Sequence, residues 1–371
     1  MELLRKLVCY VPTLRFSNKT IWEKKRIKDF CEVNPKTEEL EDEFIYIDLE
    51  SVSKGCLLSK NIISKTNAPS RAQRVLKNND ILFQCVRPYQ MNNLLFNAEN
   101  ADFQYVASTG YAQIRTQENS SFVYQLLHSS KFNKEVMLRC TGSSYPAISS
   151  SDLEDIEVYI CGVEEQQKIG YFLDLIDRRI AVQNKIISKY ETLIKGLCDK
   201  IFRHDKSVCL SDLVKCKTSI LQENEIATYY NGEYNVFGAS GIIASINKYQ
   251  FEEDSILVLK DGSKAGKIQY AEGKYSVVGT SVVLIPNNAD DARYLYFAML
   301  SIDFDKYKVG SGIPHIYFKD YSCERIYYPN SALRIRIAKV LDAYEQKVEI
   351  EKEMLSALQK QKAFLLQSMF I

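Results

Sequence analysis

Apolar residues recur at alternating spacings of four and three through residues 164–202. The members of this ladder are Ile169, Leu173, Ile176, Ile180, Ile187, Tyr190, Ile194, Leu197 and Ile201, and Gln183 fills its one polar step. A period of 3.5 residues held over about five heptads is typical of a helix that lies along another helix. No proline interrupts the segment, so the pattern predicts one long helix.

The same ladder returns 168 residues further along the chain. Its members are Ile337, Leu341, Tyr344, Val348, Leu355, Leu358, Leu365 and Met369, and Glu351 stands at the step that matches Gln183. We therefore expect two long helices of one chain, packed on each other as a spacer. The central positions of the predicted seam are Ile176, Ile180, Gln183, Ile187, Tyr344, Val348, Glu351 and Leu355.

The polar pair in the seam allows two interpretations. Gln183 and Glu351 either fix the register of the helix pair, as a buried polar residue does in coiled coils, or face a partner protein. The first interpretation is the simpler one.

The segments outside the helices have the strand and turn signals of mixed α/β domains. Strands are predicted at 44–49, 80–87, 103–114 (with a break at 108–110) and 156–160, and a helical patch at 122–132. A second cycle follows His204, in which 210–213 matches 27–30, 255–258 matches 80–83, 278–281 matches 106–109, and 294–302 is again helical. Near the ends of the two cycles the match at offset 168 becomes close, as in Gly142/Gly310, Ser143/Ser311 and Pro146/Pro314.

These matches predict a tandem duplication of an α/β (α+β) domain followed by a long helix. The expected parts are a first domain with its N-terminal arm (1–160), a central helical spacer (161–203), a second domain (204–328) and a C-terminal helical spacer (329–371).

Composition narrows the class of protein. The chain has 371 residues, no run of 18 apolar residues and no signal-peptide pattern at its start, so a membrane protein is not expected. The ten cysteines include no C-x-x-C pair, which indicates reduced core residues of a cytoplasmic protein. The net charge of +1 is low for a nucleic-acid binder, so any DNA affinity must come from a local patch or from a partner.

Catalytic motifs are incomplete in the sequence. The segment 262–267 has three residues between its glycines, where a P-loop has four, and Ile268 follows the lysine in place of Ser or Thr. The Glu-x-Lys of residues 345–347 lies in the second predicted helix, and no Pro-Pro pair occurs. His128, His204 and His315 are far apart. The expectation is a non-enzymatic protein without a metal site.

Polar and basic turns flanked by aromatic residues remain as candidate binding loops. Arg, Gln, Asn and Ser can read base edges, and Lys can hold phosphates, whereas a solvated loop is the alternative for each turn taken singly. The candidate DNA-binding residues are Arg71, Gln73, Arg74, Arg87, Tyr89, Asn92, Ser144 and Tyr145 in the first domain, and Lys260, Ser263, Lys264, Lys267, Ser311, His315 and Tyr317 in the second.

At these loops the chain resembles the specificity (S) subunits of Type I DNA restriction-modification systems. The resemblance spans nearly the whole chain. It is carried by SRAQR (70–74) followed by DILF (80–83), RPY (87–89), STGY (108–111), EEQQKI (164–169), QSMF (367–370), FGASGII (237–243) and GSKAGK (262–267). The second helix opens with ALRIRI (332–337) and lacks the Glu-Gln-Gln pattern, which leaves open whether the two helical faces dock equally.

The resemblance implies two target recognition domains joined by an antiparallel helix pair, each domain reading one half of a split site in double-stranded DNA. It also implies a non-catalytic subunit that binds two copies of the modification (methyltransferase) subunit and the restriction (motor-nuclease) subunit. S-adenosylmethionine, ATP and Mg are then expected on those partners and no cofactor on this chain.

One alternative stays open: a non-enzymatic coiled-coil scaffold whose domains bind proteins. The sequence also leaves open the recognised bases, the spacer length, the presence of a restriction subunit and whether the gene is one of several exchangeable variants.

Overall fold

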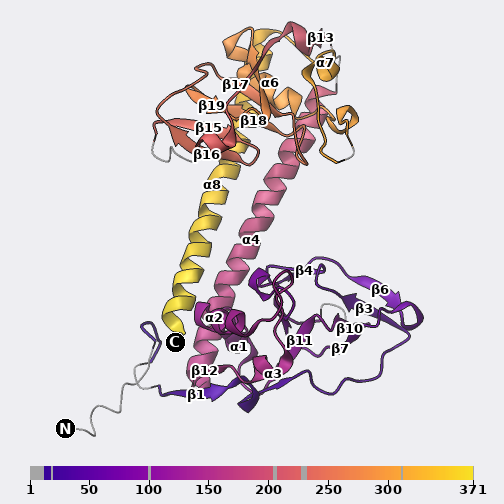
Figure 1. Ribbon diagram of the computed structural model, residues 1–371, viewed down its shortest axis with the longest axis vertical. Helices are drawn as coiled ribbons and strands as arrows, with labels where there is room; N and C mark the ends of the chain where they lie inside the picture. The colour runs from indigo at the N-terminus through magenta and orange to yellow at the C-terminus, as the bar shows by residue number, and fades with distance from the viewer. Residues whose placement is uncertain are drawn as a thin grey trace, which may run out of the picture. The chain divides into compact units, whose positions relative to one another are not determined.

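The computed structural model describes residues 12–17, 20–98, 102–203, 207–226, 232–310 and 312–370. The chain divides into two compact units. Unit 1 comprises Met1–Val182 and Leu355–Ile371, and unit 2 comprises Gln183–Met354. Each unit therefore combines one α/β domain with a part of each long helix (Figure 1).

Two helices dominate the secondary structure. Helix α4 (Val163–Phe202) has 40 residues and helix α8 (Ser331–Met369) has 39. Within unit 2, Gln183 contacts Glu351 and the later Tyr190 contacts the earlier Tyr344, so the helices run antiparallel there. The prediction of two long, mutually packed helices from the 3.5-residue ladder is confirmed.

Unit 1 contains two four-stranded sheets and two strand pairs. The first sheet has the order β6 (Asn61–Ser64), β3 (Glu43–Ile47), β10 (Gln104–Ser108), β7 (Ala72–Val75). The second has the order β2 (Cys31–Val33), β11 (Tyr111–Thr116), β8 (Ile81–Gln84), β9 (Leu94–Leu95). The pairs are β1 (Trp22–Arg26) with β12 (Glu157–Cys161), and β4 (Val52–Ser53) with β5 (Cys56–Leu57). Its short helices are η2 (Ile27–Asp29), η3 (Lys65–Asn67), η4 (Pro88–Gln90), α1 (Ser120–Leu126), α2 (Ser130–Arg139) and α3 (Ser150–Glu154).

Unit 2 repeats this plan. Its larger sheet has the order β14 (Val214–Thr218), β20 (Ser281–Pro286), β17 (Ser255–Leu259), β18 (Ile268–Ala271). The smaller has the order β16 (Gly241–Ile246), β15 (Tyr234–Gly238), β19 (Tyr275–Val277), and β13 (Val208–Cys209) pairs with β21 (Arg325–Ile326). The short helices are η5 (Leu210–Asp212), α5 (Glu223–Ile226), η6 (Ala289–Asp291), α6 (Ala292–Met299), η7 (Asp305–Tyr307) and α7 (Phe318–Tyr321).

The two domains correspond strand by strand, as the duplication predicted. The orders β2–β11–β8–β9 and β14–β20–β17–β18 match, and in each remaining sheet one parallel pair occurs, β3 with β10 and β15 with β19. The differences are the pair β4–β5 and strand β7, since unit 2 has no described counterpart of that pair and no described strand that pairs with β19 at the edge corresponding to β7. The strand that carries Gln73 and Arg74 is thus an addition specific to unit 1.

Two predicted boundaries in unit 1 were wrong. The helical patch at 122–132 is two helices, because the Ser129 hydroxyl accepts a hydrogen bond from the Phe132 amide and caps a new helix, α2. The strand expected at 80–87 ends at Gln84, because Arg87 has the left-handed backbone conformation (φ 56°), which extended pairing does not accommodate.

The described cysteines are all free, and four of them, Cys31, Cys85, Cys161 and Cys198, are buried. The expectation of reduced core cysteines is met at these positions. Cys56, Cys216 and Cys323 are exposed instead.

The hydrophobic core of each unit includes residues from both long helices. In unit 1, Ile169 and Leu173 of α4 and Leu365 and Met369 of α8 pack with the sheet β2–β11–β8–β9 and helices α1 and α2. Phe370 follows α8 and places its ring 5.4 Å from that of Phe122 in α1.

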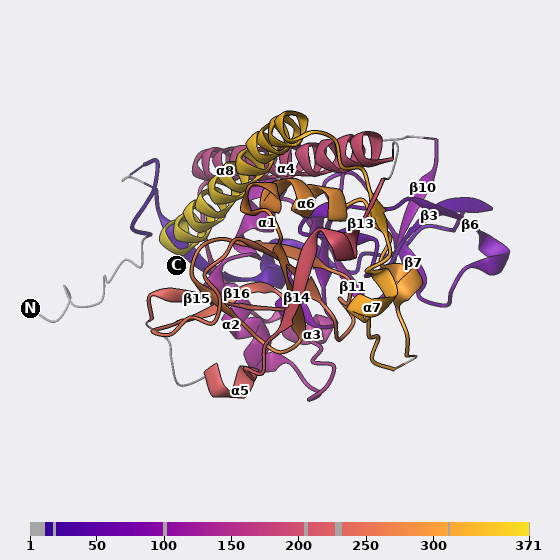
Figure 2. The same cartoon turned by 90° about the horizontal axis from the view of Figure 1, so that it is seen from above.

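In unit 2 the core includes the end of α4 and the start of α8, the opposite ends from those in unit 1. Cys198 and Phe202 from the end of α4, with Ala338 and Leu341 from the start of α8, pack on α6 and the sheet β14–β20–β17–β18. Figure 2 shows the ribbons of α4, α6 and α8 from above. The Phe202 ring lies 5.5 Å from Tyr294 of α6. Each domain is therefore completed by the end of one helix and the start of the other.

Replacing Phe370 by alanine should lower the free energy of unfolding of unit 1 by about 3–5 kcal/mol, because a buried ring is lost and the site collapses only partly. Phe364, which is 60% exposed on α8, provides a matched control, and Phe364→Ala should change stability by no more than about 0.5 kcal/mol. Urea unfolding of the purified chain measures both. Equal effects would show that the C-terminal turn contributes nothing to this core.

Candidate nucleic-acid interface

A short hairpin loop precedes the last small helix of each domain and has the same geometry in both. Thr141 and Ala147 exchange two backbone hydrogen bonds of 2.9 Å, and Val309 and His315, which are 168 residues further on, exchange bonds of 2.9 and 2.8 Å. The loop conformations therefore agree although the side chains differ.

The glycine that begins each hairpin loop has a positive φ. Gly142 has φ 90° and Gly310 has φ 94°. A Cβ atom would lie 3.1 Å from the Tyr145 carbonyl oxygen at Gly142 and 2.9 Å from that of Ile313 at Gly310. Both copies of the loop consequently require glycine.

In each unit the hairpin loop is hydrogen-bonded to the segment that follows one strand, β8 in unit 1 and β17 in unit 2. In unit 1 the amide of Ile148 donates to the Cys85 carbonyl (3.1 Å) and that of Arg87 donates to the Pro146 carbonyl (2.8 Å). In unit 2 the amide of Ile316 donates to the Lys260 carbonyl (2.9 Å) and that of Gly262 to the Pro314 carbonyl (3.0 Å). Cys85 thus corresponds to Lys260, and Arg87 corresponds to Gly262.

A third segment joins these two loops in each unit. In unit 1 the Cys85 amide donates to the Gly110 carbonyl (3.0 Å), and the Thr109 amide donates to the Arg71 carbonyl (2.9 Å). In unit 2 the Lys260 amide donates to the Thr280 carbonyl (2.8 Å). We call these connected segments the loop face: residues 70–74, 85–92, 108–110 and 141–147 in unit 1, and 260–267, 278–281 and 309–317, apart from Ser311, in unit 2.

Three arginines lie on the loop face of unit 1. Arg71 is exposed, Arg74 is partly buried, and the Arg87 guanidinium carbon lies 4.3 Å from the centre of the Tyr145 ring. No carboxylate among the described residues pairs with any of them, whereas Arg115 of the same domain binds the buried Asp80 at 2.7 Å.

Arg74 is the least satisfied of the three. Its Nε atom is buried and has no hydrogen-bond partner among the described residues, and burial lowers the pKa of its guanidinium. A charged group held in this way is stabilised by an anion or by a pair of acceptor atoms from outside the chain.

The other candidates of unit 1 divide into two groups. Gln73 donates to the Ser70 carbonyl (2.7 Å), and the Asn92 side-chain oxygen accepts from the Lys54 amide (3.3 Å), so both hold local backbone. Tyr89, Ser144 and Tyr145 are exposed on the loop face.

The candidates of unit 2 form a lysine turn and a His–Asp pair. Ser263, Lys264 and Lys267 are exposed, and Lys260 is partly buried. The segment 262–267 forms a turn, in which the Ala265 amide donates to the Gly262 carbonyl (2.9 Å) and the Lys267 amide donates to the Lys264 carbonyl (3.0 Å).

His315 closes the hairpin loop of unit 2, opposite Val309. Its Nδ1 atom lies 2.8 Å from the Asp261 carboxylate, so its Nε2 atom is the one left for an outside ligand. Tyr317 is exposed with the Lys319 ammonium 5.5 Å from its ring, and the candidate Ser311 lies outside the described residues.

Four of the eight predicted seam residues are buried and the other four are partly buried. Gln183 is 5% exposed; its side-chain amide donates to the Glu351 carbonyl (3.1 Å) and to the Glu351 carboxylate. This contact supports the interpretation that the polar pair sets register rather than facing a partner. Ile176, Ile187 and Val348 are buried, and Ile180, Tyr344, Glu351 and Leu355 are partly buried.

A buried junction at the start of each long helix escaped the sequence analysis. Gln166 donates to the Cys161 carbonyl (2.7 Å) and to Glu118 (2.9 Å). At offset 168, Arg334 donates to the Pro329 carbonyl (2.6 Å) and binds the 2%-exposed Asp291 at 2.7 Å. The second helix lacks the Glu-Gln-Gln pattern, but Arg334 anchors its start as Gln166 anchors the start of the first helix. The alignment of position 334 with position 166 at offset 168 could have identified Arg334 from the sequence.

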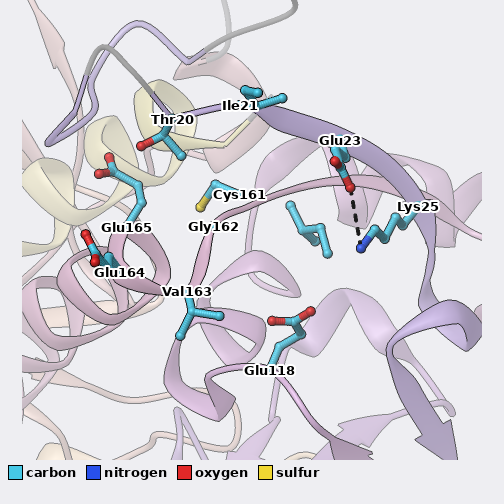
Figure 3. Close-up of a pocket in the computed structure, with 11 residues that line it drawn as sticks. Thr20, Ile21, Glu23, Lys25, Glu118, Cys161, Gly162, Val163, Glu164 and Glu165 are labelled. Carbon is cyan, nitrogen blue, oxygen red and sulfur yellow. Dashed lines mark ion pairs between the residues drawn. The ribbon is translucent and has the colours of Figure 1, made fainter.

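A hollow of about 560 Å³ lies at the start of α4 in unit 1 (Figure 3). Glu23, Glu118, Glu164 and Glu165 line it, and Lys25 pairs with Glu23 at 3.6 Å. Negative charge of this density repels DNA phosphates, so the hollow is distinct in chemistry from the loop face.

The described residues include no group of three or more His, Cys, Asp or Glu placed to hold a metal ion. Among the described helices, none has the length and apolarity needed to cross a bilayer.

Comparison with known proteins gives a consistent result. Residues 20–192 and 205–360 match the family described as "Type I restriction modification DNA specificity domain". The chain is 27% identical over 163 residues to the type I restriction enzyme MjaVIII specificity subunit of Methanocaldococcus jannaschii, a match that spans 42% of this chain and 38% of that relative. It therefore covers less than half of the length of this curated relative.

Two solved structures have a similar fold. One is the Type-I restriction-modification system S subunit from M. genitalium, with a TM-score of 0.66 and 20% identity, covering 97% of this chain and 99% of that chain. The other comes from a study of complex assembly and conformational transition of the type I R-M system, with a TM-score of 0.53 and 20% identity, covering 93% and 96%. At these identities the likeness concerns the fold.

Two similar α/β domains, each followed by one helix of an intramolecular pair, define a class of DNA-specificity proteins. Because the family match covers both domains and most of both helices, the chain belongs to the Type I restriction modification DNA specificity family. This family comprises the non-catalytic specificity subunits, and the resemblance drawn from the sequence motifs is confirmed.

Replacing Gly310 by alanine should destabilise the hairpin loop of unit 2 by about 1–3 kcal/mol, because a residue with Cβ is strained at this φ. Loss of hydrogen-exchange protection at the His315 amide, which donates to Val309, would report it. Gly312 has open space around its Cβ position and serves as the control, since Gly312→Ala should leave that amide protected. Equal exchange in the two variants would contradict the requirement for glycine.

Proposed function

We propose that this chain recognises a bipartite DNA site and directs the methyltransferase and restriction subunits of a Type I restriction-modification complex to that site. The observation that carries the proposal is the group Arg71, Arg74 and Arg87, without a carboxylate partner among the described residues, on the loop face of unit 1. The loop face of unit 2 presents Lys264 and Lys267 instead.

Arg74 and Arg87 are partly buried and have no carboxylate partner among the described residues, whereas Arg179, Arg325 and Arg336, which also lack one there, are exposed to solvent. Arg115 and Arg334 have buried aspartate partners, and Arg293 binds both Asp342 and Glu345. DNA supplies the missing partners as phosphate oxygens and as acceptor atoms on base edges. The loop face is then the DNA-contacting surface of each domain.

The two domains should read different sequences. Strand β7 with Gln73 and Arg74 belongs to unit 1, and the Asp261–His315 pair belongs to unit 2. Different side chains on equivalent backbone frames support two unlike half-sites rather than a palindrome.

The proposed DNA contacts are Arg71, Gln73, Arg74, Arg87, Tyr89, Asn92, Ser144, Tyr145, Lys260, Ser263, Lys264, Lys267, Ser311, His315 and Tyr317. Among these, Gln73 and Asn92 act by holding loop backbone. Because the net charge is only +1, partner subunits supply many of the phosphate contacts in the complex.

Two copies of the modification subunit and one kind of restriction subunit are the proposed protein partners. Ile350 (59% exposed) and Met354 (45% exposed) lie one turn apart on α8, and offset 168 assigns the same positions on α4 to Val182 and Ile186. Val182 is also exposed (55%), whereas Ile186 is partly buried. The exposed apolar residue that recurs at 182 and 350 supports docking of two identical partners. S-adenosylmethionine, ATP and Mg act on those partners, in the cytoplasm, and this chain contributes no cofactor site.

Single-molecule sequencing of adenine methylation tests the proposal. Cells that carry this gene with its neighbouring methyltransferase gene should acquire a split motif of two short defined blocks around an unspecified gap. Cells with the methyltransferase gene alone are the control. An unchanged methylome would favour the protein-scaffold alternative.

The helix pair should set the gap between the two blocks. Deleting residues 183–189 together with 351–357 removes one heptad from each helix and should shorten the spacer by about 10 Å, or about three base pairs. Deleting 183–189 alone is the control, since it shifts one helix against the other and should reduce stability rather than give a new spacing. If the double deletion still methylated a motif with the original gap, the helix pair would not set the spacing.

A further inference from the structure

The loop that leaves β8 holds an arginine in an unfavourable backbone conformation. Arg87 has φ 56° and ψ 55°, in the left-handed region that residues with Cβ rarely adopt. The corresponding residue of unit 2 is Gly262 (φ 93°), which adopts a positive φ without strain. Strain of this kind persists where the side chain is used, so the arginine itself has a function at this position.

The backbone around Arg87 is fixed on both sides. Its amide donates to the Pro146 carbonyl (2.8 Å), and its carbonyl accepts from the Gln90 amide (3.0 Å). Pro88 follows directly and restricts the next φ angle. The direction in which the Arg87 side chain leaves the loop is therefore determined by the fold.

A buried glutamine braces the same loop from inside. The Gln84 side-chain amide donates to the Val86 carbonyl (2.8 Å) and to the Gln90 side chain (2.8 Å), and its oxygen accepts from the Asn92 amide (3.1 Å). Gln84 is 1% exposed, and its backbone amide donates to the side-chain oxygen of Asn93 (2.8 Å), which is also 1% exposed.

Unit 2 closes the equivalent loop without a side chain. Leu259 stands at the position of Gln84, its amide donates to the Lys267 carbonyl (2.9 Å), and its carbonyl accepts from the Gly266 amide (2.7 Å). Only unit 1 therefore has a buried carboxamide, that of Gln84, bonded to this loop, and only unit 1 has an arginine in the loop at position 87.

The guanidinium of Arg87 is restrained as well. It lies 4.3 Å from the centre of the Tyr145 ring, which is 64% exposed, and no described carboxylate pairs with it. A guanidinium stacked on a ring keeps its in-plane N–H groups available, and two of these match a pair of acceptor atoms that lie side by side.

We propose that Arg87 is a specificity-determining residue that donates to O6 and N7 of a guanine in the half-site read by unit 1, and that Gln84 is the positioning residue that holds Arg87 in place. This inference rests on the proposed function. A phosphate group offers a similar pair of acceptors. The fixed loop and the stack favour the base, because a phosphate is reached equally well by flexible lysines such as Lys264 and Lys267 of unit 2.

Chemical substitution of the DNA provides the decisive test. The half-site is first defined from the methylome, and the purified complex with the modification subunit is then bound to duplexes in which one guanine at a time is replaced by 7-deazaguanine. At one guanine of the unit 1 half-site, loss of N7 should weaken binding of the wild-type complex by about 5- to 150-fold. The Arg87→Ala complex should not distinguish the two duplexes.

Three further variants separate the roles. Arg87→Lys keeps the charge and should lose the discrimination, because a lysine cannot make the paired contact. Gln84→Leu copies unit 2 and should reduce discrimination at the same guanine while the half-site of unit 2 and the melting temperature of the complex change little. Arg26 lies outside the loop face and pairs with Asp155 at 3.6 Å. The Arg26→Ala complex is the control, and it should methylate the same motif as the wild type.

The possible results have distinct meanings. A wild-type methylome without a split motif overturns the proposed function itself. A split motif whose unit 1 half contains no guanine, or keeps its specificity in Arg87→Ala, overturns only this inference. Uniformly weaker binding of Arg87→Ala to all sequences, with full activity of Arg87→Lys and a salt slope smaller by about 0.9, assigns Arg87 to a phosphate and also overturns it.

Discussion

The start of one long helix and the end of the other pack together inside each hydrophobic core. Ile169 and Met369 belong to one core cluster in unit 1, and Phe202 and Leu341 belong to one core cluster in unit 2. Because each core includes residues of both helices, the helix pair is part of the fold of each domain. The buried contact between Gln183 and Glu351 contributes because a shift of register would leave a buried polar group without its partner.

This constraint explains why the sequence predicted the framework well. The 3.5-residue ladder placed the first helix at 164–202, and the structure has Val163–Phe202, because a seam along a whole helix repeats in the sequence. The match of Gly142 with Gly310 at offset 168 has a structural reason, since both hairpin loops need a residue with positive φ at that position. The family resemblance rested instead on short motifs that each occur in one half of the chain.

The details of the loop face were beyond prediction because they depend on contacts between distant segments. The sequence marks Arg87 as a candidate, but its left-handed backbone depends on the Pro146 carbonyl, and its brace depends on Gln84, which reads as the end of a strand. Likewise, Asp291 and Arg334 form a buried ion pair across 43 residues. Neither residue stands out when its local sequence is considered alone.

The hairpin loops have a consequence for how specificity can change over time. Their frame consists of backbone hydrogen bonds and one glycine, so the side chains at 143–145 and 312–313 contribute little to holding it. Substitutions there alter which groups are displayed without refolding the domain or disturbing the core beneath. Under the proposed function, a few substitutions in these loops would change the DNA sequence that is read and leave the helix pair unchanged. The side chains that would set the target therefore stand on a backbone frame that does not depend on them.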